Sequence, residues 1–244
     1  GKWWHDPLTG YPFEKFTAIP KTQRPLGQNP DATPFVLHRD GETRQPAVRC
    51  MILYPMNALV EDQLTRLRAA LDSDAVTRVF DEELHGNRIF FGRYTGETPV
   101  TGFREHPRDD SKKETDRRHK QLSQLFDYYC STEKTQEDIK HVVKQGENDK
   151  GAVGGQRKVV GSDRYMFPRT NGSELIDRWN IQETPPDILI TNITMLGGML
   201  NRDVDAPILD ATRTWLENND DSYFYLVVDE LHLHRGTAGT EVAY

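Results

Sequence analysis

The strongest constraint on the fold is an apolar run near the end of the chain that stops abruptly at two adjacent carboxylates. Residues Phe224 to Val228 show no alternation of apolar and polar side chains, and Asp229 and Glu230 follow at once. Such an uninterrupted run predicts a fully buried central strand of a parallel sheet, because those strands are covered on both faces. Ligands of open parallel sheets bind just beyond the carboxyl ends of the strands. We therefore expect both carboxylates to stand at a ligand-binding edge.

Two adjacent carboxylates at such an edge have a specific chemical use. One can hold a hydrated cation while the other orients or deprotonates a water molecule, which is the pairing that hydrolysis of a nucleoside triphosphate needs. The simpler interpretation is a helix N-terminus that carries favourable negative charge. The hydrolytic interpretation gains weight because three other apolar segments end in equally polar turns.

These three segments are also predicted strands. They span Val48–Tyr54, Arg88–Tyr94 and Asp187–Ile190, and they end at Pro55-Met56-Asn57, Thr95-Gly96 and Thr191-Asn192. Leucines at helical spacing predict a helix over Ala58–Leu71, and Asn192 is suited to cap a helix over Ile193–Leu200. A further helix is expected over Ala211–Asn218. Strands that alternate with helices predict an α/β fold, in which a parallel sheet is built with right-handed crossovers.

Two parts of the chain fall outside this alternation. Residues 1–47 are rich in proline, glycine and turn residues, and we expect an irregular N-terminal extension there. Residues 102–180 combine a charged tract with helical patterns around Lys120–Cys130 and Thr135–Lys144, followed by the glycine-rich stretch Gly146–Gly161. We expect this region to be a largely helical, partly flexible insertion into the sheet domain.

Composition limits the class of protein. The net charge of −7 over 244 residues argues against a wholly basic nucleic-acid-binding surface, although it is compatible with a local basic groove. Cys50 and Cys130 lie far apart and match no metal-binding spacing, so we expect reduced thiols and a cytoplasmic location. No stretch approaches the ~20 apolar residues of a membrane-spanning helix, and no membrane association is expected.

Taken in order, the four strand ends resemble the motifs of superfamily 2 helicases. The segment Leu53–Gln63 is similar to the first nucleic-acid-contacting motif, and Tyr94–Pro99 is similar to the glycine-bearing motif that follows it. Asp187–Asn192 resembles the motif with a threonine at a helix start, and Val228–His232 resembles the Walker B, or DExH, motif. The amino-acid sequence of these motifs resembles that of bacterial DNA helicases of the Lhr and MrfA-like branch. It is closer still to the large helicase subunit of the DISARM anti-phage system.

The resemblance implies the first RecA-like domain of such a helicase, a parallel sheet with helices on both faces formed by residues 48–101 and 181–244. The implied activity is ATP-dependent movement on DNA, with ATP and Mg²⁺ as cofactors and a place in anti-phage defence. The implied partners are DNA, single-stranded or duplex with a tail, the remaining helicase domains and a subunit of a defence complex.

The resemblance also implies a role for individual residues. Asp229 would hold Mg²⁺ through water, Glu230 would act as general base toward the attacking water, and His232 would couple the nucleotide and nucleic-acid sites. Seven residues would contact the sugar-phosphate backbone: Pro55, Asn57, Gln63, Thr95, Gly96, Thr191 and Asn192. Turns and helix N-termini present backbone N–H groups to phosphate oxygens, and such contacts make binding tolerant of sequence.

The sequence departs from the family because it has no Gly-x-x-x-x-Gly-Lys-Ser/Thr loop, which would normally cradle the phosphates of ATP. In the family order this loop would precede Gly1, so we expect a piece of a larger helicase that has no ATPase activity alone. Two alternatives stay open. One is a non-catalytic helicase-like module that binds DNA or a partner. The other is a metal-dependent hydrolase that uses His232 and His234 together with Asp229.

Overall fold

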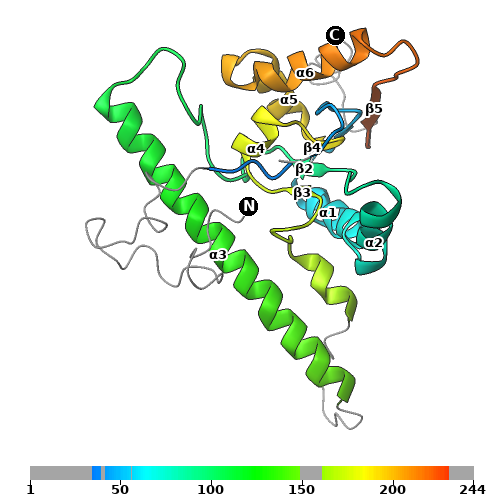
Figure 1. Ribbon diagram of the computed structural model, residues 1–244. Helices are drawn as coiled ribbons and strands as arrows, with labels where there is room; N and C mark the ends of the chain where they lie inside the picture. Colours follow the sequence, from blue (N-terminus) through cyan, green and yellow to red (C-terminus); the bar gives the residue numbers. More distant parts are fainter. Residues whose placement is uncertain (1–34, 40–41, 56, 149–160, 231–244) are drawn as a thin grey trace.

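A five-stranded parallel sheet forms the centre of the computed structural model (Figure 1), which describes residues 35–39, 42–55, 57–148 and 161–230. The strand order is β3-β2-β4-β1-β5, and every pairing is parallel. The strands are β1 (Cys50–Leu53), β2 (Phe91–Arg93), β3 (Glu174–Leu175), β4 (Ile188–Thr191) and β5 (Tyr225–Val228). The predicted α/β fold with a parallel sheet is therefore confirmed.

Helices connect the strands. They are α1 (Asn57–Leu71), α2 (Asp74–Glu83), α3 (Lys112–Asn148), α4 (Arg178–Glu183), α5 (Ile193–Leu200) and α6 (Ala206–Glu217), with short 3-10 helices η4 (Gly161–Met166) and η5 (Asp203–Asp205). The bounds predicted for α5 are confirmed. Helix α6 begins five residues earlier than predicted, because Pro207 lies in its first turn, where a missing N–H removes no hydrogen bond.

Successive strand residues point to opposite faces of the sheet and build two separate cores. Met51 and Leu189 pack on one face with residues of α4, α5 and α6. Their neighbours Ile52 and Ile190 pack on the other face with residues of α1. Figure 1 shows α5 and α6 on one side of the sheet and α1 on the other. This double cover explains why β1 and β4 carry the uninterrupted apolar runs that are typical of parallel strands.

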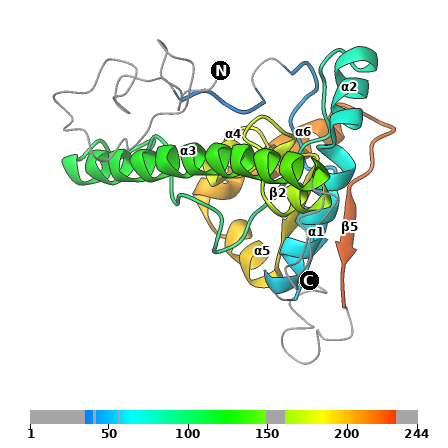
Figure 2. The same ribbon diagram turned by 90° about the horizontal axis from the view of Figure 1, so that it is seen from below.

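One long helix replaces the two that the sequence predicts in the insertion. Helix α3 runs unbroken for 37 residues, which corresponds to about 55 Å at 1.5 Å per residue. Figures 1 and 2 show it crossing one side of the molecule and extending past it. The predicted break after Cys130 is wrong, because the hydroxyls of Ser131 and Thr132 donate to the carbonyl of Tyr128 inside the helix and do not end it.

The sheet takes its edge strand β3 from within the range 102–180. Glu174 of this strand is buried and forms a bidentate ion pair with Arg68 of α1, at 2.6 Å to Nε and 2.8 Å to Nη2. The segment that lies outside the sheet therefore ends before residue 174. Residues 149–160 of the glycine-rich stretch lie outside the described residues, as do residues 1–34 of the N-terminal extension.

Strand β5 differs most from its prediction. Within the described residues it pairs only with β1, and Tyr225, Leu226 and Val227 are 62, 50 and 46% exposed. Among the residues that the structure describes, the prediction of a fully buried central strand is thus wrong, because β5 forms an edge of the sheet there (Figure 1). The opposite edge, β3, is only two residues long and is buried. An exposed apolar edge strand is a surface on which another strand can pair.

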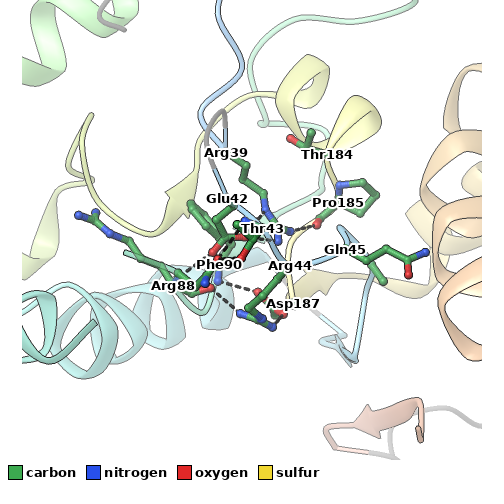
Figure 3. A network of polar contacts seen from close by, with 12 residues as sticks. Arg39, Glu42, Thr43, Arg44, Gln45, Arg88, Phe90, Thr184, Pro185 and Asp187 are labelled. Carbon is green, nitrogen blue, oxygen red and sulfur yellow. Dashed lines mark hydrogen bonds and ion pairs between the residues drawn. The ribbon is translucent and has the colours of Figure 1, made fainter. Parts of the chain in front are cut away.

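A network of arginines and carboxylates joins the amino ends of the strands (Figure 3). Asp187, the residue before β4, accepts hydrogen bonds from Arg44, from Arg49 Nη1 at 2.7 Å and from the backbone N–H of Phe90 at 2.9 Å. Its side chain is only 4% exposed, and the two guanidinium groups offset the cost of burying its charge. The network therefore fixes the start of β4 against the starts of β1 and β2.

Gly92 of β2 leaves no room for a methyl group. A Cβ there would lie 2.9 Å from the carbonyl oxygen of Leu175 and 3.2 Å from Cδ1 of Ile181. Because this carbonyl belongs to the neighbouring strand, we expect Gly92→Ala to lower the free energy of unfolding by about 1–3 kcal/mol, measured by urea denaturation. Gly96→Ala is the matched control, since no atom lies within 4 Å of a Cβ at Gly96. Equal stability of the two variants would contradict this packing.

Candidate functional site

The carboxyl ends of the strands lie along one border of the sheet. The register aligns Leu53 of β1 with Thr191 of β4 and with Val228 of β5. Hydrogen bonds continue past the strands, where Tyr54 N donates to Thr191 O at 3.0 Å and Asp229 N donates to Leu53 O at 2.9 Å. The polar segments that follow β1, β4 and β5 are therefore neighbours, as the parallel direction of the strands requires.

A buried side chain ties the end of β2 to this border. Thr191 Oγ1 donates to the carbonyl of Tyr94 at 2.7 Å, and Tyr94 N donates to Ile190 O at 2.8 Å. Thr191 and Thr95 are both 0% exposed, so their side chains point inward. Of the four residues predicted as contacts here, Gly96 is exposed and Asn192 is partly exposed.

Two helices begin at the same border. Asn192 caps α5 as predicted, because its side-chain oxygen accepts a hydrogen bond from Met195 N at 2.7 Å. Helix α1 begins at Asn57, after the half-buried Pro55, and Gln63 lies on its second turn, partly exposed. The side chain of Asn57 is outside the described part of the chain. The N-termini of both helices carry partial positive charge toward this border, which favours an anionic ligand.

A compact turn follows β2 and holds Gly96 at the surface. Thr95 N donates to Thr98 Oγ1 at 3.0 Å, and the same hydroxyl donates to Arg93 O at 2.8 Å. Glu97 N donates to Thr95 Oγ1 at 3.3 Å. The hydroxyl groups of Thr95 and Thr98 are thus used to shape the turn, which leaves its exposed backbone at Gly96 for a ligand.

Sequence reasoning missed a buried polar cluster behind this turn. The hydroxyl of Tyr94 donates to Asp205 and accepts a hydrogen bond from Gln182 Nε2 at 2.8 Å, while Arg202 pairs with Asp205 at 2.5 Å. Burial, followed by the hydrogen bond to Asp205, raises the pKa of Tyr94, so the hydroxyl stays protonated and acts as the donor. The only sequence signal was the acidic pair Asp203 and Asp205, just before the proline in the first turn of α6.

Asp229 and Glu230 follow β5 directly. Asp229 is half-buried and accepts a hydrogen bond from Glu230 N at 3.0 Å, while Glu230 is exposed. Glu230 has φ of 49°, a left-handed conformation that is uncommon for a residue with a side chain and is often found at functional sites. Burial, and then the charge of Asp229, raises the pKa of Tyr54 at the end of β1.

This carboxylate pair fits a hydrated Mg²⁺ ion, which keeps several of its waters and needs only one or two carboxylates. Within the described ranges, no group of three His, Cys, Asp or Glu side chains is arranged to hold a metal directly. His232, predicted to couple the two sites, lies outside the described residues together with His234. The His-x-His alternative therefore stays a prediction.

The fold and this border define an α/β protein whose parallel sheet gathers polar turns and two carboxylates at its carboxyl edge. Among curated proteins, the chain is similar to Druantia protein DruE of Escherichia coli (strain UMEA 4076-1), with 30% identity over 222 residues. The alignment covers 81% of this chain but 11% of DruE, so the chain spans about a tenth of the length of that relative. No family model matches the chain, and neither does a solved structure.

The sequence resemblance pointed to the DISARM helicase subunit, which is a different protein from the relative found here. No helix among the described residues combines the length and the apolar character needed to cross a membrane.

The hydrogen bond from Thr191 to Tyr94 offers a test of how the border is held. Thr191→Val removes the donor and leaves the buried carbonyl of Tyr94 with one partner fewer, so we expect the free energy of unfolding to fall by about 1–3 kcal/mol. Thr194→Val on the exposed side of α5 is the control and should be nearly neutral. If urea denaturation gave the same midpoint for both variants, the hydrogen bond would not hold the border.

Proposed function

We propose that this chain forms part of the first RecA-like domain of an ATP-dependent superfamily 2 DNA helicase or translocase that acts in antiviral defence. The observation that carries the proposal is the gathering of four motif-like strand ends along one border of a parallel sheet. The similarity to DruE supports the defence context. The sheet domain would comprise residues 48–101 and 181–244, with 102–180 as an insertion that contributes β3.

The nucleic-acid track would run over the turns and helix N-termini of the border. Gly96, Asn192, Pro55 and Gln63 are the predicted contact residues with exposed or partly exposed surface. Thr95 and Thr191 would hold the turns from inside, because their hydroxyls bond within the protein. Contacts of this kind reach phosphates rather than base edges, as movement along DNA of any sequence requires.

The hydrolytic centre would form around the two carboxylates after β5. Mg²⁺, when bound, would neutralise charge on the phosphates of ATP. Asp229 would hold that ion through water, Glu230 would accept the proton of the attacking water, and His232 would relay the state of the nucleotide to the nucleic-acid track. The phosphate-binding loop would come from another part of the longer protein. The exposed edge of β5 supports this, since further strands could pair there and cover Tyr225 and Leu226.

DNA binding by the 244-residue chain is the first test. We expect affinity for a fluorescent single-stranded oligonucleotide to fall with salt, with a log–log slope of about −0.7 for each phosphate contact. Gly96→Ala should weaken binding several-fold, because a methyl group would obstruct the approach of a phosphate to the turn. The open space around Gly96 means that stability should not change. A slope near zero for the unaltered chain would contradict the proposed track.

ATP hydrolysis is the second test. In the full-length protein we expect Glu230→Gln to lower the DNA-stimulated ATPase rate by about 10²–10⁴-fold, the usual contribution of a general base. Glu217→Gln, an exposed residue at the end of α6, is the control and should keep the full rate. The 244-residue chain alone should show no turnover. A turnover in this chain that Glu230→Gln abolishes would show that the nucleotide site is complete within it.

The same measurements separate the two alternative functions. DNA binding by a full-length protein that hydrolyses no ATP would favour the non-catalytic module. One zinc ion per purified chain would favour the hydrolase built on His232 and His234.

A further inference from the structure

Helix α4 holds the turn after β2 from the buried side. Arg178, its first residue, donates from Nη2 to the carbonyl of Thr95 at 2.7 Å and from its backbone N–H to Pro99 O at 3.2 Å. Its guanidinium lies over the ring of Tyr94, 5.4 Å from the centroid, and the residue is only 6% exposed. One buried arginine therefore contacts the turn where it begins and where it ends.

This contact sets the direction of the peptide group at the tip of the turn. The described residues contain no cis peptide bond, so the carbonyl of Thr95 and the N–H of Gly96 point in opposite directions. Arg178 and Thr98 N hold that carbonyl toward the protein. The N–H of Gly96 consequently points away from Arg178, toward the exposed side of the turn, where it can donate to an anion.

The N-terminus of α4 is itself fixed by the long helix α3. Asp177 caps α4 by accepting a hydrogen bond from Asn180 N at 2.9 Å on Oδ1. Its other oxygen accepts hydrogen bonds from Tyr129 Oη of α3 at 2.8 Å and from Asn180 Nδ2 at 2.6 Å. Asp177 is 0% and Tyr129 is 1% exposed, so water does not compete for these contacts. Two consecutive residues, Asp177 and Arg178, thus connect α3 to the turn.

The segment between the turn and α3 is held as well. Trp179 Nε1 donates to Gly102 O at 3.1 Å, and Arg117 Nη1 of α3 donates to Thr101 O at 2.7 Å. Thr101 N donates to Gln121 Oε1, also of α3, at 2.8 Å. The turn is consequently clamped on both sides, by α4 directly and by α3 through the chain that leaves it.

We propose that Arg178 is a positioning residue for nucleic-acid binding, which orients the N–H of Gly96 toward a phosphate, and that α3 supports it through Tyr129 and Asp177. This inference rests on the proposed function, because it needs the Gly96 turn to contact DNA. Arg178 itself is buried and makes no contact with the ligand. The insertion would thereby help to orient the Gly96 turn for nucleic-acid binding, in addition to its structural role in the fold.

The test measures affinity of the 244-residue chain for a single-stranded oligonucleotide over a range of salt concentrations. We expect Arg178→Gln to weaken binding about tenfold and to make the log–log slope shallower by about 0.7, the value of one phosphate contact. Arg178→Lys keeps the charge and one donor, so it should recover part of the affinity and part of the slope. Tyr129→Phe removes only the hydroxyl that bonds Asp177. It should change affinity and slope in the same direction as Arg178→Gln, but by less.

Two controls distinguish a positioning role of Arg178 from a general effect of its charge on binding and from a loss of protein stability. Arg213→Gln removes an equal charge from an exposed site on α6 and should leave affinity and slope unchanged. A loss of folded protein lowers the active fraction but does not alter the slope, so the slope reports the turn itself. In the Gly96→Ala background, Arg178→Gln should add little, since both changes act on one contact.

The outcomes distinguish the inference from the function on which it rests. If the unaltered chain does not bind the oligonucleotide, the proposed nucleic-acid track fails. If it binds, and Arg178→Gln, Arg178→Lys and Tyr129→Phe all keep the original slope, the track stands and the positioning role of Arg178 is overturned. The lysine and phenylalanine variants keep this decision open to measurement even where Arg178→Gln does not fold.

Discussion

The border depends on the common direction of the strands, and a buried carboxylate at the opposite end of the sheet holds them in register. Asp187 is surrounded by Arg44, Arg49 and the N–H of Phe90, and an uncompensated charge at this depth would cost several kcal/mol. A slip of β4 by one residue would separate these groups and turn every apolar side chain to the other face. Because strands are stiff over four residues, the register set at the amino ends also fixes Thr191 beside Tyr94 at the carboxyl ends.

Local patterns in the sequence predicted four of the strands and the helices α1, α5 and α6, because the causes of these elements are local. Asn192 lies before an apolar helix and its side chain reaches an N–H three residues on, so the cap and the helix bounds follow from neighbouring residues alone. The exposure of β5 has no such local cause. An apolar run indicates that a strand is suited to burial, but the cover has to come from elsewhere, and within the described residues only β1 supplies it. The sequence patterns also predicted two helices, around Lys120–Cys130 and Thr135–Lys144, where the structure has the single helix α3.

The common border of the strand ends was predictable from the sequence, but the orientation of the side chains along it was not. The order of the motifs predicted that Thr95 and Thr191 lie at one border of the sheet, yet both side chains point inward. Thr95 Oγ1 accepts a hydrogen bond from Glu97 N in the same turn, and Thr191 Oγ1 donates to the carbonyl of Tyr94. The residues that shape the border from behind could not be found from motifs. Arg178 and Asp205 meet the end of β2 from 83 and 111 positions away, and such long-range contacts leave no periodic trace in the sequence.

The insertion is therefore a structural part of the border rather than an appendage. The middle of α3 buries Phe126 and Tyr129 against Ile176 and Trp179, in a cluster separate from the two cores of the sheet. Helix α4 contributes to this cluster and to a core of the sheet, since Trp179 packs on α3 while Ile181 packs on the sheet. Because protein interiors are closely packed, a shift of α3 would be transmitted to α4 and not absorbed. The first residue of α4 is the arginine that holds the Gly96 turn, so the position of α3 and the geometry of the border are mechanically linked.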